Sequence, residues 1–185
     1  MSALPSLSRF VVLLICSSVI NSPASAAPAV GTVSKIQNQA QVGGRTASVG
    51  APVHMNEQLL TGANARLQVT FRDGTVLTLG ENAKVVVDRY VYNPGESTGA
   101  LALNASRGAV RLATGKLNQA RDKKITVSTP YAALAVRGTE FWTGPIDGHY
   151  GAYLLKGKVG VRNRAGAVTL SAPGQGTDIR RSRRR

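Results

Sequence analysis

One serine lies in a setting that could support catalysis. Gly95-Glu96-Ser97-Thr98-Gly99 matches the G-x-S-x-G pattern of hydrolases, in which a sharp strand-to-helix turn exposes the serine oxygen as a nucleophile. Here the match follows Asn-Pro and leads into Ala-Leu-Ala-Leu, which alternates like a strand, so the required helix is missing. We therefore interpret the match as a hydrophilic loop and predict no catalytic role for Ser97.

Few residues of the chain could support metal-dependent or acid–base chemistry. The two histidines, His54 and His149, are far apart in the sequence, and a catalytic zinc site takes three protein ligands dominated by His or Cys. The nine acidic residues lie singly, and nothing in the sequence indicates that a pair such as Glu81 and Glu140 flanks one bond, as glycoside hydrolysis requires. No glycine-rich phosphate loop is present. We predict no catalytic residue, metal or cofactor, and thus no enzyme.

Positive charge is the most conspicuous chemical property of the chain. It has 23 Lys and Arg against 9 Asp and Glu, a balance that indicates anionic partners. Five of these cations end the chain: Arg180, Arg181, Arg183, Arg184 and Arg185. Such a tail either holds a polyanion by charge, without shape specificity, or is only a solubilising end. In both cases we expect truncation after Thr177 to leave thermal stability nearly unchanged.

The elements that would position any site are short strands. Leu67, Val69 and Phe71 alternate with polar residues, the Asp73-Gly74 pair predicts a hairpin turn, and the chain returns through 76–79. Further strand signals lie at 84–88, 90–92, 101–103, 110–112, 125–127, 132–136, 140–143, 150–155, 158–162 and 168–170.

No long stretch has helical periodicity, and the polar, basic segment 115–124 predicts an exposed loop. We expect an all-β fold, a twisted β-solenoid-like or sandwich arrangement of many short strands.

An export signal is predicted at the N-terminus. Arg9 precedes the apolar run 10–20, which is shorter than the roughly 20 residues that a membrane-spanning helix needs. Ala24-Ser25-Ala26 then supplies the A-x-A site of a signal peptidase. We predict a signal peptide over 1–26 that is cleaved after Ala26, and a periplasmic or secreted location.

The remaining chain is expected to form one β domain over 27–177, followed by a basic tail over 178–185. Cys16 would leave with the signal, and Ile15 before it argues against a lipoprotein, so the mature protein could form no disulfide. No second apolar stretch approaches membrane-spanning length, and we expect no transmembrane segment.

The middle of the chain resembles a FecR-type domain. The resemblance begins with a T-G pair before a strand and a D-G-[ST] turn, continues through "T-P-x-A…V-R-G-T-x-F", and closes with "G-x-V-x-V" and "G-Q"; it covers roughly 31–176. The motif residues are Thr61, Gly62, Asp73, Gly74, Thr129, Pro130, Arg137, Gly138, Thr139, Phe141 and Gly157. Arg137 either orders neighbouring carbonyls through its five donors or is an exposed charge at a strand end.

This resemblance implies an all-β interaction module outside the cytoplasm. The best-known members of the family regulate iron-uptake signalling and carry an N-terminal segment that binds a sigma factor, followed by a membrane span. Neither is expected here, so we expect no sigma-factor partner and no nucleic acid. The expected partner is an envelope protein or an anionic cell-wall polymer. The alternatives are a structural protein that assembles through its β edges and a periplasmic signalling sensor.

Overall fold

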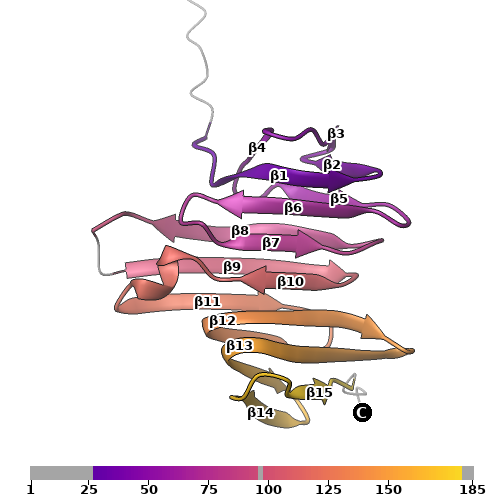
Figure 1. Cartoon of the computed structure of the whole chain (residues 1–185), viewed down its shortest axis with the longest axis vertical. Helices are drawn as coiled ribbons and strands as arrows, with labels where there is room; N and C mark the ends of the chain where they lie inside the picture. The colour runs from indigo at the N-terminus through magenta and orange to yellow at the C-terminus, as the bar shows by residue number, and fades with distance from the viewer. Residues whose placement is uncertain (1–26, 96–97, 181–185) are drawn as a thin grey trace, which may run out of the picture.

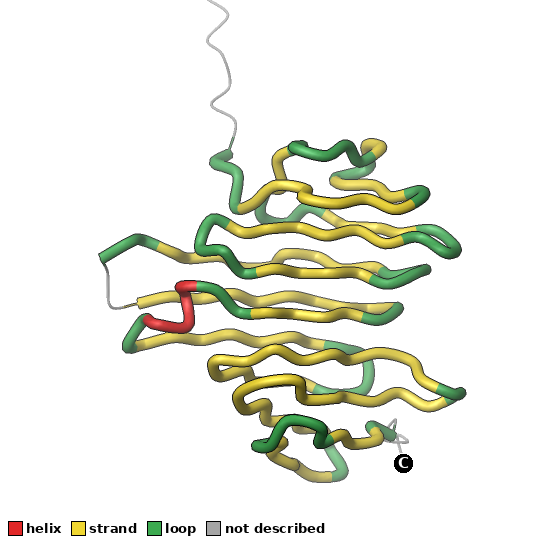
Figure 2. Tube along the Cα trace, viewed as in Figure 1, coloured by secondary structure: helices red, strands yellow, loops and turns green. Residues whose placement is uncertain are grey.

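The computed structural model describes residues 27–95 and 98–180, which form one strand-dominated unit. Its strands belong to a single 15-stranded sheet that curls back on itself (Figure 1). Loops and one short 3-10 helix, η1 (Lys116–Gln119), join the strands (Figure 2). The expected all-β fold is confirmed. None of the helical segments in this part of the chain has the length and apolar character that crossing a membrane requires.

Two layers result from the curl, and we name each after a central strand. The β10 layer contains strands that neighbour one another in the order β4, β1, β6, β7, β10 and β12. Their bounds are β1 (Gly31–Gln37), β4 (Pro52–Val53), β6 (Arg66–Phe71), β7 (Val76–Leu79), β10 (Val110–Ala113) and β12 (Ala133–Ile146).

The β9 layer runs in the order β3, β2, β5, β8, β9, β11 and again β12. Its pairs are antiparallel except for β9 with β11, which are parallel. The bounds are β2 (Ala40–Val42), β3 (Arg45–Thr46), β5 (Gln58–Thr61), β8 (Lys84–Tyr92), β9 (Thr98–Arg107) and β11 (Asp122–Ser128).

Two long strands belong to both layers. The first part of β12 pairs with β11 and its second part pairs with β10, with a register shift between Arg137 and Glu140. β13 (His149–Asn163) follows β12 along both parts, and then pairs with β14 (Gly166–Leu170) and β15 (Gly176–Asp178). The sequence predicted two short strands in place of each long one. Gly138 and Gly157 mark a bulge in a continuous ladder rather than strand ends.

The core lies between the two layers. Strand alternation sends every second side chain inward, and most of these residues are apolar. Leu77, Leu112 and Phe141 come from the β10 layer, while Leu101 and Leu134 come from the β9 layer; each is fully buried. With no disulfide available within the described residues, this packing and the backbone ladder hold the fold together.

Two boundaries differ from the expectation. The packed domain continues past 177, because β15 extends to Asp178 and the Ile179 side chain is only 5% exposed. The backbone N–H of Ile179 also donates to the Tyr150 carbonyl at 2.6 Å. The segment 115–124 is not an exposed loop: it contains η1 and the start of β11, and Leu117 is fully buried. The predicted signal peptide and most of the arginine tail lie outside the described residues.

Candidate binding surface

Asp73 is the centre of a buried polar network. Its carboxylate accepts hydrogen bonds from the Thr75 hydroxyl at 2.6 Å, the Leu117 N–H at 3.1 Å, the Tyr90 hydroxyl at 3.1 Å and the Thr75 N–H at 3.3 Å. The Asp73 carbonyl accepts the Lys116 N–H, and the Asp73 N–H donates to the Tyr90 oxygen. The predicted β6–β7 hairpin turn is therefore also the point where η1 and β8 attach.

The aromatic member of this network is shielded from solvent. Tyr90 is buried and its ring stacks on Phe71 with centroids 5.3 Å apart. Burial, and then the negative charge of Asp73, raise the pKa of Tyr90 far above its ordinary value. Gly115 passes so close to the turn that a Cβ there would lie 2.4 Å from the Asp73 carbonyl oxygen. The site is closed and full, so it holds the fold and leaves no room for a ligand.

The other family-motif residues have similar roles at separate turns. Thr61 is buried, donates to the Gly80 carbonyl at 2.6 Å and accepts the Ala83 N–H at 2.8 Å, which ties β5 to the β7–β8 turn. The N–H of the neighbouring Gly62 donates to the Gln39 carbonyl. Thr129 donates to the Ala132 carbonyl across Pro130 at 2.9 Å, closing the turn between β11 and β12.

The V-R-G-T segment forms the bulge at which β12 passes from one layer to the other. The Thr139 hydroxyl donates to the Lys158 carbonyl at 2.7 Å and accepts the Arg137 N–H at 3.1 Å. Gly138 has a φ of +61° and Gly157 a φ of +84°, and a Cβ on Gly157 would lie 2.0 Å from the Gly138 carbonyl oxygen. The Arg137 side chain is exposed and makes no hydrogen bond to a described residue, so it is an exposed charge, although it lies within β12 and not at a strand end.

The structure therefore does not bring the motif residues together into one site. They fix four separate turns and bulges, and Phe141 fills the core. Ser97 lies outside the described residues. Among the described residues, no group of three or more His, Cys, Asp or Glu is placed to hold a metal ion. Glu81 and Glu140 do not meet: Glu81 accepts the Asn64 N–H, whereas Glu140 pairs with Arg111.

A different set of residues forms a surface suited to binding. Cross-strand register places Arg111 of β10 beside Trp142 of β12, and Trp142 beside Tyr153 of β13, on the outer face of the β10 layer. We call these three residues the aromatic row. Trp142 is half-buried, and Tyr153 is 43% exposed. Arg111 forms an ion pair with Glu140 of β12, which restricts its position.

Glycines beneath the rings keep this face flat. A Cβ on Gly144 would lie 3.1 Å from the Trp142 ring, and a Cβ on Gly176 would lie 3.3 Å from the Tyr153 ring. Both rings thus cover positions that have no side chain. Each keeps one side toward solvent, with Tyr153 the more exposed of the two.

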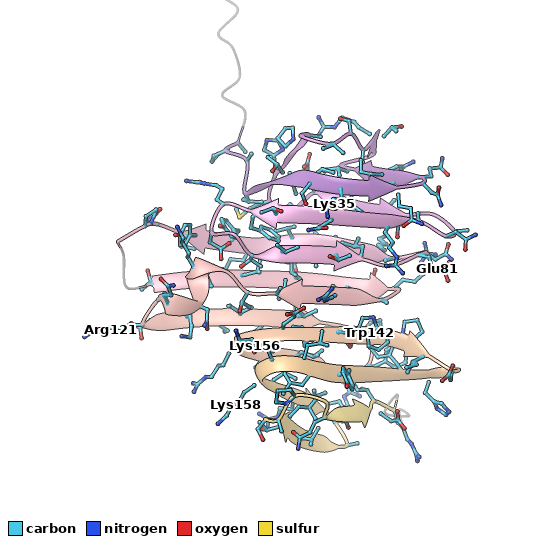
Figure 3. All side chains as sticks on the ribbon, viewed as in Figure 1. Lys35, Glu81, Arg121, Trp142, Lys156 and Lys158 are labelled. Carbon is cyan, nitrogen blue, oxygen red and sulfur yellow. The ribbon has the colours of Figure 1, made fainter. Side chains whose placement is uncertain are left out.

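Two hollows flank the aromatic row and share Arg111 and Trp142. The first, of about 600 Å³, is mostly apolar and extends over β13 and β15; Ile146 of β12 and Leu155 of β13, which line it, are 52% and 38% exposed. The second, of about 540 Å³, is more polar and extends over β6 and β7 to Arg66 and Glu81. Figure 3 shows Trp142 and Glu81 on the same side of the molecule. Exposed apolar side chains gathered at a rimmed hollow are typical of an interaction site.

Comparison with known proteins identifies the family of the chain. The family model described as FecR protein matches residues 57–160, which is more than half of the chain. The chain belongs to the FecR protein family. No curated protein matches it.

Two crystal structures of a candidate anti-sigma factor from Parabacteroides distasonis are similar to it, at 20% sequence identity and a TM-score of 0.48 in both cases. The similar region covers 65% of this chain and 58% of that protein, so the chain spans less than two thirds of its length.

Sequence reasoning missed the aromatic row because no motif contains it. The signal that could have found it is alternation: Phe141 and Thr143 point inward, so Trp142 between them must point outward, where a single large aromatic side chain is unusual. The same argument applies to Tyr153 between Ala152 and Leu154. That the two strands are neighbours could not be read from the sequence, since it depends on the long β12–β13 pairing.

Proposed function

We propose that this FecR-family chain is an exported, non-enzymatic binding module that docks an envelope protein on the aromatic row. The observation that carries the proposal is the alignment of Arg111, Trp142 and Tyr153 across three neighbouring strands. Arg, Trp and Tyr are the residue types that dominate the binding energy of protein interfaces, and such anchors cluster in the centre of a contact.

The surroundings of the row have the composition of an interface. The apolar hollow next to Tyr153 offers a pocket for an aliphatic or aromatic side chain of the partner. The more polar hollow on the other side carries Arg66 and Glu81, which suit the polar rim of such a contact. Export is supported by the predicted signal peptide, and the envelope is therefore where the partner is sought.

Edge-to-edge assembly, the structural alternative, is less favoured. Two strands that end the layers, β3 and β4, have two residues each; of the edge strands that pair with β13, β15 has three and β14 has five. Very short edge strands offer few unpaired backbone groups, which is one way in which β proteins avoid pairing with other chains.

Site-specific photocrosslinking in the native host tests the proposal. A photoreactive residue at Ile146, which lines the apolar hollow, is expected to give a discrete crosslinked product with an envelope protein. Trp142→Ala in the same chain is expected to abolish that product, because truncating a central aromatic anchor costs about 2 kcal/mol or more. The matched control is a photoreactive residue at Val49, which is 67% exposed but lies in the β3–β4 loop. Equal products from both positions, or a product unaffected by Trp142→Ala, would contradict the proposal.

A further inference from the structure

The positive charge of the folded domain is unevenly distributed. Between residues 107 and 180 the chain has twelve Lys and Arg against four Asp and Glu, whereas between 27 and 106 it has six against five. Thus the segment from the end of β9 to β15 carries most of the excess charge, even before the last five residues are considered. Figure 3 shows Arg121, Lys156 and Lys158 projecting from one side of this part of the molecule.

Three of these cations form a line on the outer face of the β9 layer. Ile125 pairs with Val136 at the end of the β11–β12 ladder, and Lys124 of β11 and Arg137 of β12 are the residues next to this last pair. Arg137 in turn pairs with Lys158 of β13. All three side chains are exposed. Because neighbouring strands are about 4.8 Å apart, this cation row spans roughly 10 Å.

The fold does not neutralise the cation row. Ion pairs within the described residues join Glu57 to Arg45 and His54, and Glu140 to Arg111; none reaches the row. Asp122 lies on the same face of β11, two positions before Lys124, and makes no ion pair either. Like charges directly opposite one another destabilise a sheet. An anionic ligand along the row would remove this repulsion.

The surface beside the row is flat and lacks aromatic side chains. On the same outer face, two positions away from the row on each strand, the neighbouring cross-strand line consists of Ala102, Thr126, Ala135 and Gly160. Arg89 ends this line on β8, and Arg162 lies on the next line along β13. Single-stranded nucleic acids need aromatic platforms on which the bases stack. A flat, non-aromatic strip bordered by cations suits a linear polymer that carries its charges on the sugar units themselves.

We propose that Lys124, Arg137 and Lys158 bind a linear anionic polysaccharide, on the layer opposite the aromatic row. The Arg137 guanidinium matches the geometry of a carboxylate or phosphate group, and the two lysines act as flexible point charges on either side of it. Successive anionic groups of one chain would then contact successive strands. This site differs from the predicted arginine tail, because it belongs to the rigid sheet and has a fixed spacing.

The test compares two triple variants of the full-length exported protein. The first is Lys124→Gln, Arg137→Gln and Lys158→Gln. The matched control is Lys35→Gln, Arg72→Gln and Arg107→Gln, which removes the same charge from exposed positions away from the row. Both variants keep the C-terminal tail, so its contribution is equal. The probe is fluorescently labelled polygalacturonate, a linear carboxylate polysaccharide, and the measurement is fluorescence anisotropy between about 50 and 300 mM salt.

The row variant is expected to bind polygalacturonate at least about tenfold more weakly at 50 mM salt. The slope of the logarithm of its association constant against the logarithm of the salt concentration should also be smaller in magnitude by about two, since each contacted charge contributes roughly 0.7 to this slope. The control variant should lose less than threefold. Thermal unfolding should show both variants folded, with the row variant no less stable. Trp142→Ala should leave this affinity unchanged, which separates the polysaccharide site from the protein-docking proposal.

Two results would overturn the inference. One is equal loss of affinity in the two triple variants, which would mean that only net charge matters. The other is a stronger, row-dependent affinity for labelled oligo-dT than for polygalacturonate, which would assign the row to nucleic acid.

Discussion

Replacing Asp73 tests whether the buried polar network holds the fold. Asp73→Ala removes the acceptor for the Thr75 hydroxyl, the Leu117 N–H and the Tyr90 hydroxyl, which then lie buried without it. Each unsatisfied buried group costs about 1–3 kcal/mol, and partial relaxation reduces the sum, so we expect a loss of about 3–6 kcal/mol. A typical domain has only about 5–15 kcal/mol in total. Urea denaturation followed by circular dichroism measures the change, and the melting temperature should fall by roughly 6–20 °C.

The isosteric variant Asp73→Asn makes the test more specific. Each carboxylate oxygen of Asp73 accepts one backbone N–H, from Thr75 or from Leu117. An amide must place its NH2 group against one of these donors, so Asp73→Asn should also cost about 1–3 kcal/mol although its shape is unchanged. The control is Glu81→Ala, an exposed acid that accepts a single backbone N–H, and it should cost less than about 1 kcal/mol. Asp73→Asn with native stability would refute the account of Asp73 as an obligatory acceptor.

Two further predictions concern the C-terminus and the tyrosines. Truncation after Thr177 should lower the free energy of unfolding by about 2–4 kcal/mol, because it removes the buried Ile179 side chain and the hydrogen bond from its N–H to the Tyr150 carbonyl. Truncation after Arg180 should change it by less than about 0.5 kcal/mol. Thermal unfolding measures both, and equal melting temperatures would contradict a domain boundary beyond 177. In an alkaline absorbance titration, two of the five tyrosines, Tyr90 and Tyr150, should ionise last, because burial raises the pKa of both. The unfolded chain loses these protons near pH 10, whereas the folded chain keeps them. The free energy of unfolding should therefore fall above about pH 10, and it should fall less in Tyr90→Phe.

The strands could be predicted because their cause is local. Alternating side chains and the Asp73-Gly74 turn fix the β6–β7 hairpin, and the observed strands agree with the expected ones there. The segment 115–124 could not be predicted, since its polar composition gives no sign that Asp73, more than forty positions earlier, accepts its backbone N–H groups. The predicted strand breaks at Gly138 and Gly157 are wrong for a related reason: a glycine with positive φ serves a turn and a bulge equally well.

The two proposed binding surfaces depend on pairing between distant strands, and no sequence pattern contains that information. Trp142 and Tyr153 become neighbours only through the β12–β13 ladder, and Lys124 comes near Arg137 only because the adjacent residues Ile125 and Val136 pair between β11 and β12. The family motif, in contrast, was visible in the sequence because turns and bulges impose residue types at fixed spacings. In this protein most of the recognisable motif residues build the scaffold, and the residues suited to recognition lie outside the motif, with Arg137 as the exception.

The sharing of β12 and β13 between the two layers has a mechanical consequence. Arg137 and Trp142 lie on one continuous strand, as do Lys158 and Tyr153 on the next, so one hydrogen-bonded ladder connects the two outer faces. A pulling force between ligands on the two faces would load this ladder along the strands, which shears many hydrogen bonds at once instead of opening them one by one. The domain should thus transmit a force between its two faces stiffly, rather than bend as a hinge.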